Sequence, residues 1–188
     1  ERDDLHFRSL KTLENIHEGN LGRVYERLLV HCSECKLPKK ELDYLVVAAN
    51  YSDSMGDQIE ARELMNSAGK ILHVLPLVED ERVKKQFEIN ILLGSLLRRT
   101  GEINAAENLL RQTQILAEKR NDQLTEAKIL TPLGAMWGAQ GKIDSALTAL
   151  KRALELFDKF HLPGEVIDCY INLGASCNVV YRFGENLE

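Results

Sequence analysis

The chain lacks most of the features by which enzymes, nucleic-acid-binding proteins and membrane proteins are recognised. Aromatic residues make up only 6% of its 188 residues, and it contains four prolines. Aromatic residues are enriched in strands, so their scarcity favours helices over sheets. Hydrophobic residues still reach 44%, which is enough for a chain of this length to bury a substantial core.

An excess of positive charge is also lacking. Acidic and basic residues are interleaved and leave a net charge of −5, so no basic stripe is available for a phosphate backbone. No apolar run approaches the roughly 18 residues that cross a bilayer, and the first residues, ERDDLHFRSL, contain no apolar signal segment. We therefore expect a soluble protein that binds neither nucleic acid nor membrane. Because the chain has no initial Met and ends in GENLE, we also expect it to be a piece of a longer protein.

Cysteines are few and unevenly spread. Cys32, Cys35, Cys169 and Cys177 are too few for a disulfide scaffold of this length, which favours a reduced, cytoplasmic protein. Cys32 and Cys35 have the CxxC spacing of zinc and redox sites, but no second pair follows at the spacing that a closed metal site needs. A metal or redox function is therefore the less favoured alternative to packing as small hydrophobic residues.

Enzyme signatures are absent as well. The sequence contains no G-x-G-x-x-G, no G-x-x-x-x-G-K-[ST], no G-x-S-x-G and no H-E-x-x-H. Its five histidines are scattered and form no recognisable constellation. We predict a protein that is not an enzyme, with no catalytic residue, no metal ligand and no cofactor.

What the chain does contain is a spaced pattern of small and large apolar residues. Three glycines, at 56, 101 and 141, serve as origins for comparing three windows. Five offsets agree in residue class: seven before (Ala49, Gly94, Gly134), five after (Ala61, Ala106, Ala146), nine after (Met65, Leu110, Leu150), twelve after (Ala68, Thr113, Ala153) and fifteen after (Ile71, Leu116, Leu156). Small residues let two antiparallel helices approach closely, and large ones fill the space beside them.

This array resembles the tetratricopeptide repeat family. The resemblance covers roughly residues 39 to 188 and rests on Leu93-Gly94 with Gly101, on Leu133-Gly134 with Trp137 and Gly141, and on Leu173-Gly174. The period of about 40 exceeds the usual 34 and is similar to that of longer repeats in bacterial regulatory and signalling proteins. The resemblance implies an all-α fold: a right-handed superhelix, or α-solenoid, of antiparallel helix pairs in about four to five repeats.

We expect one repeat domain over 1–188. It divides into a divergent or capping hairpin and four repeats, the last truncated: 1–38, 39–78, 79–121, 122–161 and 162–188. Helices are predicted near 4–17, 20–35, 39–54, 57–73, 79–99, 102–119, 122–139, 142–160 and 163–181, with another starting near 184. Pro132 falls inside one of them, which predicts either a kink or a helix that begins later.

The resemblance also implies a binding face. In the family, side chains at fixed positions of the first helix of each pair line a concave inner surface. Carried onto this chain, the predicted partner-binding residues are Asn50, Asp53, Glu88, Ile91, Ser95, Arg98, Lys128, Thr131, Ala135, Asp168, Ile171 and Asn178. Arg98 and Lys128 would meet an acidic partner, and Asn50 and Asn178 would bond an extended backbone.

The function implied is that of a scaffold for a protein or peptide ligand, the sensor or interaction module of a larger bacterial signalling or transcription-regulatory protein. The alternative is a self-association platform, in which the apolar end of the last repeat pairs with a second copy in a homodimer.

Overall fold

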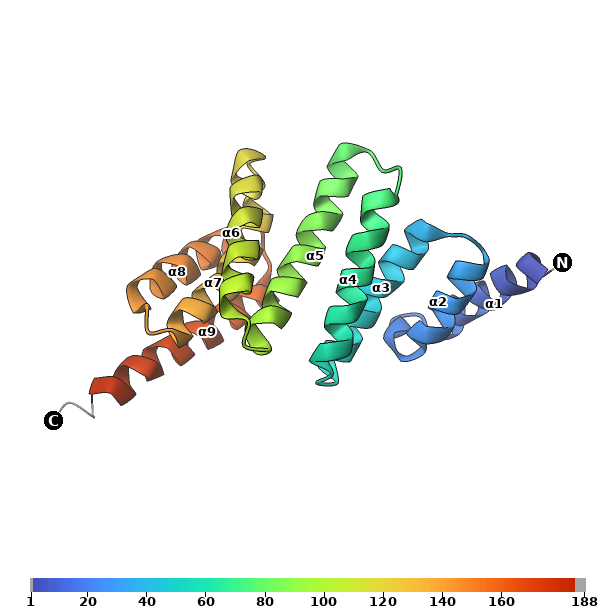
Figure 1. Ribbon diagram of the computed structural model, residues 1–188. Coiled ribbons are helices and arrows are strands. Elements are labelled where there is room, and N and C mark those ends of the chain that lie inside the picture. The colour runs from blue at the N-terminus through green and yellow to red at the C-terminus, as the bar shows by residue number, and fades with distance from the viewer. Residues whose placement is uncertain (1, 185–188) are drawn as a thin grey trace. The chain divides into compact units, whose positions relative to one another are not determined.

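The computed structural model describes residues 2–184, with side chains up to residue 176. Over this range the chain is helical and forms no strand, which confirms the predicted all-α class (Figure 1). The elements are α1 (Arg2–Ile16), the 3-10 helix η1 (Leu21–Val24), α2 (Tyr25–Glu34), α3 (Pro38–Ser54), α4 (Gln58–Val74), α5 (Glu79–Arg99), α6 (Ile103–Lys119), α7 (Gln123–Ala139), α8 (Ile143–Lys159) and α9 (Pro163–Gly184).

The structure differs from the predicted helices at three points. The helix expected from residue 20 begins as η1, and α2 starts only at Tyr25. The helix predicted over 163–181 continues to Gly184, because residues 175–183 contain neither glycine nor proline to end it. The further helix expected to start near 184 lies outside the described residues. Pro132 lies in the interior of α7, so the alternative of a later helix start is also wrong.

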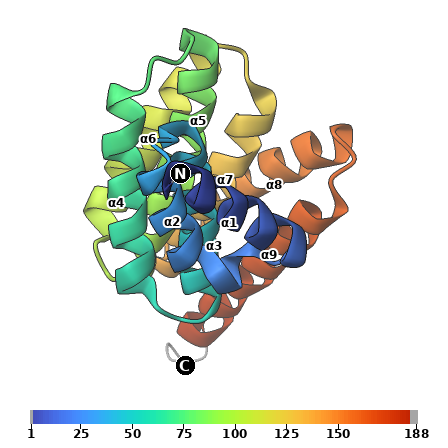
Figure 2. The same ribbon diagram turned by 90° about the vertical axis from the view of Figure 1, so that its right-hand side faces the viewer.

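The chain divides into two compact units, which are described separately. Unit 1 ends at Thr100 and holds α1–α5, and unit 2 begins at Gly101 and holds α6–α9. In unit 1 each helix packs against its neighbours in the sequence, from α1 against α2 to α4 against α5 (Figures 1 and 2). In unit 2, α7 packs against α6, α8 and α9. The predicted hairpin 79–121 therefore has its two helices in different units.

The core of unit 1 has two parts that meet at α3. One joins α1, α2 and α3 around Leu10, Leu28 and Cys32. The other joins α3, α4 and α5 around Ala49, Met65 and other buried residues. In unit 2 the buried side chains include Leu110, Leu133, Leu150 and Phe157. Large apolar residues thus fill the space between neighbouring helices, as the sequence pattern predicted.

The predicted packing positions are buried in almost every case. Ala61, Ala106 and Ala146 are fully buried, and so are the large residues four positions later, Met65, Leu110 and Leu150. Gly134 is a close-contact position: a Cβ built on it would lie 2.6 Å from Cγ of Leu150 in α8. The exceptions are Ile71, which is half-buried, and Leu116, which is 39% exposed.

Most turns between helices place a residue with positive φ just after the helix. Gly56, Gly101 and Gly141 have positive φ angles, as expected of glycine just after a helix. Lys36, Asn121 and His161 also have positive φ, between 52° and 57°, although they are not glycines. After α7, for example, the amide of Lys142 donates to the carbonyl of Trp137 at 2.9 Å and that of Gly141 to Gly138 at 3.0 Å. This pair of bonds is the Schellman motif, which satisfies the last carbonyls of a helix.

Candidate functional site

The predicted binding residues of unit 1 lie on α3 and α5. Asn50 is exposed, and its side-chain amide donates to the carbonyl of Val46 in its own helix at 2.9 Å. Glu88 is exposed and accepts from Lys85 at 3.2 Å. Ile91 and Ser95 are half-buried.

Ion pairs link α3 to α5, and they include some of the charged residues of the predicted binding face. Lys39 pairs with Glu81 at 2.5 Å, Asp43 with Lys85 at 2.7 Å, and the predicted site residue Asp53 with Arg99 at 2.5 Å. The carboxylate of Asp53 is therefore occupied by an internal partner, so it makes a weaker contact for a ligand.

Arg98 differs from its neighbours because its Nε atom is buried and has no hydrogen-bond partner. Burial, and then the nearby charge of Arg99, lowers the pKa of its guanidinium, which stays charged at neutral pH. An unpaired buried donor is costly, so Arg98 is the predicted residue of unit 1 with the most to gain from an added acceptor.

The predicted residues of unit 2 lie on α7 and α9, which pack against each other. Thr131 bridges the two helices, with its hydroxyl 3.1 Å from the carbonyl of Ala127 and 3.4 Å from Sγ of Cys169. Lys128 and Asp168 are exposed, and Ala135 is half-buried. Ile171 is 64% exposed. Asn178 lies outside the residues whose side chains are described.

Sequence analysis predicted an apolar end on the last repeat, but of the residues that form the exposed apolar face of α9 it named only Ile171. Ile167, Tyr170 and the predicted residue Ile171 are each at least 60% exposed. Gly174 continues this face, and within the described part of the chain a Cβ built on it would meet no atom within 4 Å. A comparison of equivalent positions in successive repeats could have identified this face. The residues one period earlier in α7 that correspond to Ile167, Tyr170 and Gly174 are all buried: Ala127, Leu130 and Gly134.

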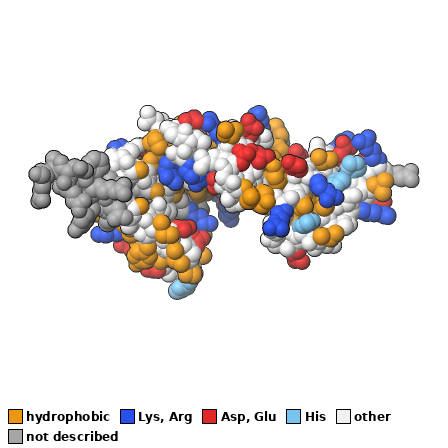
Figure 3. Space-filling model, turned by 90° about the horizontal axis from the view of Figure 1, so that it is seen from below, with side chains coloured by type: hydrophobic (Ala, Val, Ile, Leu, Met, Phe, Trp, Pro, Cys, Tyr) orange, Lys and Arg blue, Asp and Glu red, His pale blue; other side chains and the backbone are white. Residues whose placement is uncertain are grey.

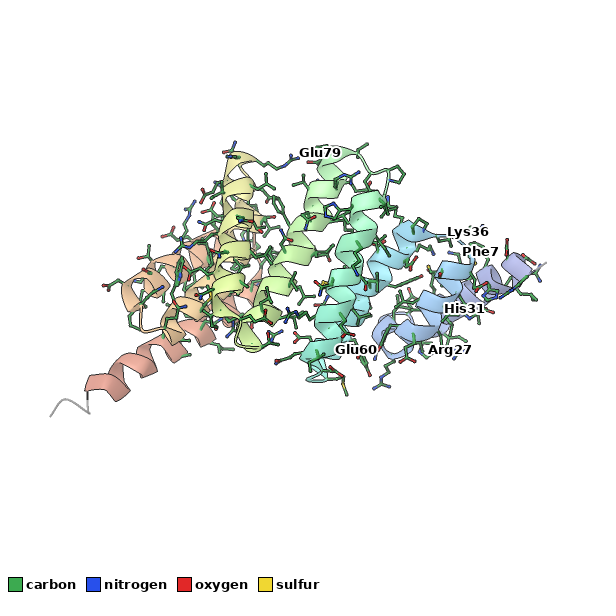
Figure 4. The ribbon with its side chains drawn as sticks, in the orientation of Figure 1. Phe7, Arg27, His31, Lys36, Glu60 and Glu79 are labelled. Atoms are coloured by element: carbon green, nitrogen blue, oxygen red, sulfur yellow. The ribbon has the colours of Figure 1, made fainter. Side chains whose placement is uncertain are left out.

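A hollow of about 560 Å³ in unit 1 was also missed. Its apolar lining comes from α1, from the start of α3 and from the loop after α4, and includes Phe7, Leu37, Pro38, Leu77 and Val78. Four lysines line it as well: Lys11, Lys36, Lys39 and Lys40. Figure 4 shows Phe7 and Lys36 at this end of the unit. Its residues come from three separate stretches of the sequence, so no local sequence pattern predicts the hollow.

A second hollow, of about 530 Å³, lies in unit 2 beside Trp137. The indole Nε1 donates to Oε1 of Glu107 at 3.1 Å, and Arg111 lies 4.9 Å from the ring centroid. Arg111 also donates to Glu107, at 2.9 and 3.0 Å. The bond from Trp137 is the main cause that lowers the pKa of Glu107. These groups satisfy one another, which makes this hollow the weaker candidate for a ligand.

The cysteines have the surroundings of packing residues. Cys32 is fully buried in the core of unit 1, and this burial raises the pKa of its thiol to about 11. A thiol with so high a pKa is a poor nucleophile and a poor metal ligand. Among the described side chains, no three His, Cys, Asp or Glu residues are placed to hold a metal ion.

Basic, acidic and apolar side chains alternate on the face of the molecule seen in Figure 3. Along residues 2–184, no helix has both the length and the hydropathy needed to cross a bilayer.

Comparison with known protein families and with curated protein sequences finds no match for this chain.

Proposed function

We propose that the chain is a tetratricopeptide-like interaction module that binds another protein by accepting an amphipathic helix on the apolar face of α9. The supporting observation is the exposure of Ile167, Tyr170 and Ile171 on successive turns of one helix. Large apolar side chains gathered on a surface are typical of protein-binding sites, whereas single exposed ones are not.

The repeat indicates what kind of partner fits. In α7 the position equivalent to Gly174 is Gly134, which Leu150 of α8 covers. The face of α9 offers the same glycine, flanked by larger apolar residues, and no side chain among residues 2–176 covers it. A helix with a leucine opposite Gly174 and small residues one turn away on either side would repeat the packing of α8 on α7.

The energy available from this contact is moderate. Burying a large apolar side chain contributes roughly 1.5–3 kcal/mol, and three of them are exposed on this face. Association and ordering of a partner helix offset part of this gain. We expect a dissociation constant on the order of 10–100 µM for a short helical peptide.

The same proposal includes the detailed architecture, the location and the role of the chain. The helices would form a right-handed superhelix of four to five repeats, in a cytoplasmic protein, and would act as the sensor or interaction module of a larger regulatory protein. The turn positions support the repeat, because Gly101, Asn121, Gly141 and His161 follow one another at equal intervals with positive φ. A metal or redox role is disfavoured by the buried thiol of Cys32.

Helix acceptance can be tested with a fluorescein-labelled peptide of residues 142–160, which contains α8, the helix that already covers the equivalent face of α7. Fluorescence anisotropy should show saturable binding to the chain and at least tenfold weaker binding to Tyr170→Asp. Val74→Asp is the matched control, because Val74 is also exposed, at 81%, but lies on α4. A scrambled peptide that binds equally well, or equal affinity for the Tyr170→Asp variant, would contradict the proposal.

Self-association is the second candidate, favoured by the same apolar face, which a second copy of the chain could cover. Sedimentation velocity at increasing concentration separates the two. A dimer that Tyr170→Asp dissolves, in a chain that does not bind the peptide, would support self-association. A monomer that binds the peptide would support the interaction module.

A further inference from the structure

We propose that the lysine-lined hollow of unit 1 is a binding site for an acidic peptide segment that carries a large apolar side chain. This site lies in unit 1 and is independent of the apolar face of α9 in unit 2. The proposal rests on the chemistry of the lining, on the local charge and on the backbone conformation of Lys36.

The floor of the hollow is apolar and partly open to solvent. Phe7 is 44% exposed and Val78 is 70% exposed, while Leu75, which also lines the hollow, is buried. Exposed apolar residues around a hollow of about 560 Å³ leave room for at least one large side chain of a ligand. Burial of that side chain would be the main source of affinity.

The wall formed by the loop after α4 is held in place. Arg82, at the start of α5, donates from its two terminal nitrogens to the carbonyl of Leu72 at 3.0 Å and that of Leu75 at 2.8 Å. These bonds satisfy carbonyl groups at the end of α4 and join them to α5. The hollow is therefore largely formed before a ligand arrives, which reduces the entropy cost of binding.

The charged side chains that line the hollow are mostly basic. Four lysines line it against a single carboxylate, that of Glu81, in a chain whose net charge is −5. Lys39 pairs with Glu81 at 2.5 Å. Lys11 and Lys40 both pair with Glu14, at 3.2 and 2.5 Å. Lys36 makes no side-chain hydrogen bond or ion pair within the described residues, so its ammonium group is available to an incoming carboxylate.

The backbone of Lys36 is the second indication. Lys36 occupies the left-handed position after α2, with a φ of 52°. Its amide donates to the carbonyl of Ser33 at 3.0 Å, and that of Leu37 donates to Cys32 at 3.1 Å. After α3 the same position is filled by Gly56, which adopts such angles without strain. A lysine is strained in this left-handed turn. We therefore attribute the presence of lysine at position 36 to a role of its side chain beside the hollow.

An acidic peptide fits this site better than nucleic acid. Lysine attracts either anion as a compact point charge, but the apolar lining matches a leucine or phenylalanine side chain of the same peptide. Duplex nucleic acid has no protruding apolar group to fill such a hollow. An anionic membrane does have acyl chains, so its binding is treated as an outcome that overturns the proposal.

The probe for the test is the fluorescein-labelled octapeptide Gly-Asp-Glu-Phe-Leu-Asp-Glu-Gly, titrated with the whole chain and followed by anisotropy. Two comparison peptides replace either Phe-Leu by Ser-Ser or all four acidic residues by Gln. We expect both comparison peptides to bind at least tenfold more weakly. Equal binding of the Ser-Ser peptide, or of the Gln peptide, would overturn the assignment.

Lys36→Gly is the decisive variant because it separates folding from binding. It removes the ammonium group and relieves the backbone, so the melting temperature should stay or rise while affinity for the octapeptide falls about fivefold. Lys36→Asn keeps a residue that tolerates the left-handed turn and should show the same loss.

The matched control is Lys70→Gly, in which the lysine is exposed on α4, away from the hollow. It should leave the affinity unchanged. Unaltered affinity in Lys36→Gly would overturn the proposal. So would tighter binding of the chain to phosphatidylserine vesicles than to the octapeptide, if Lys36→Gly abolishes the vesicle binding.

Discussion

Gly134 in α7 lies directly beneath Leu150 in α8, so close that a single added methyl group would overlap with the leucine side chain. The two residues belong to different helices of one hairpin, and both are buried. Gly174 is the equivalent of Gly134 in α9, but it is exposed, and no described atom lies within contact distance of a Cβ built on it. The same position in two repeats is thus closed in one and open in the other.

This difference predicts opposite effects of one substitution. Gly134→Ala should destabilise unit 2 by about 1–3 kcal/mol, because the methyl group forces Leu150 to move. Gly174→Ala should stabilise it by about 0.5–1 kcal/mol, because alanine is the better helix former and the space is empty. Urea unfolding followed by the fluorescence of Trp137, the only tryptophan in the chain, measures both. Equal effects would show that the helices do not pack as described.

The left-handed turns predict a second pair of opposite effects. Lys36→Gly should raise the free energy of unfolding of unit 1 by about 0.5–1 kcal/mol, since glycine adopts a φ of 52° without a steric cost. Gly56→Ala, at a φ of 87°, should lower it by about 1 kcal/mol or more. Thermal and urea unfolding followed by far-ultraviolet circular dichroism provide the measurement. A destabilised Lys36→Gly protein would mean that the turn after α2 is not in this conformation.

The carboxylate of Glu14 predicts a dependence on acid. It accepts hydrogen bonds from Lys40 at 2.5 Å and from the hydroxyl of Tyr44, both on α3. Partial burial works to raise its pKa, but the bonds from Lys40, Tyr44 and Lys11 outweigh it and lower the pKa from 4.5 to about 2. The folded chain therefore holds this carboxylate ionised more strongly than the unfolded chain does. Its contribution is present above pH 4.5 and is lost as the pH falls toward 2.

Glu14→Gln should cost about 1–3 kcal/mol at pH 7, because the donors on α3 lose a charged acceptor. The variant should also lose less stability than the original chain between pH 4.5 and pH 3. Glu63→Gln, at an exposed position on α4, is the control and should change neither. If Glu14→Gln follows the same pH profile as the original chain, the bonds between α1 and α3 do not contribute as described.

Two histidines predict a second pH dependence, nearer neutrality. Nδ1 of His6 lies 3.0 Å from Nδ1 of His31, with the rings edge to face. Burial lowers the pKa of His31, and the charges of His6 and Arg27 lower it further. Because the folded-state pKa is depressed, the unfolded chain binds more protons, and the packing of α1 on α2 should weaken as the pH falls below about 6.5. His31→Gln should flatten this dependence between pH 7.5 and 5.5, as followed by hydrogen exchange of α1.

Much of the helical framework could be predicted from the sequence, because glycine and alanine at close contacts carry a direct steric meaning. Gly141 and Ala146 marked a turn and a buried contact, and both were found where expected. The left-handed turns at Lys36 and His161 could not be predicted, since glycine is the residue type that signals such a turn and both positions lack it. Their conformation follows from the Schellman hydrogen bonds that end the helices before them.

The candidate sites were harder to predict, because a surface site depends on which residues the rest of the fold leaves exposed. Ile171 was placed on the binding face by the resemblance, and it is exposed. Ile167 and Tyr170 are residue types common in protein cores. They differ from Ala127 and Leu130, at the equivalent positions of α7, in being exposed to solvent. The lysine-lined hollow joins residues from α1, α3 and the loop after α4, a proximity that arises only on folding.

The most direct test of the central claim, that the apolar face of α9 accepts a helix, is hydrogen–deuterium exchange of the whole chain with and without the peptide of residues 142–160. The account predicts slower exchange of the backbone amides of residues 166–176 when the peptide is bound, with α1–α4 unchanged. Protection confined to α7, where the peptide would have replaced α8, or no protection under saturating peptide, would contradict it.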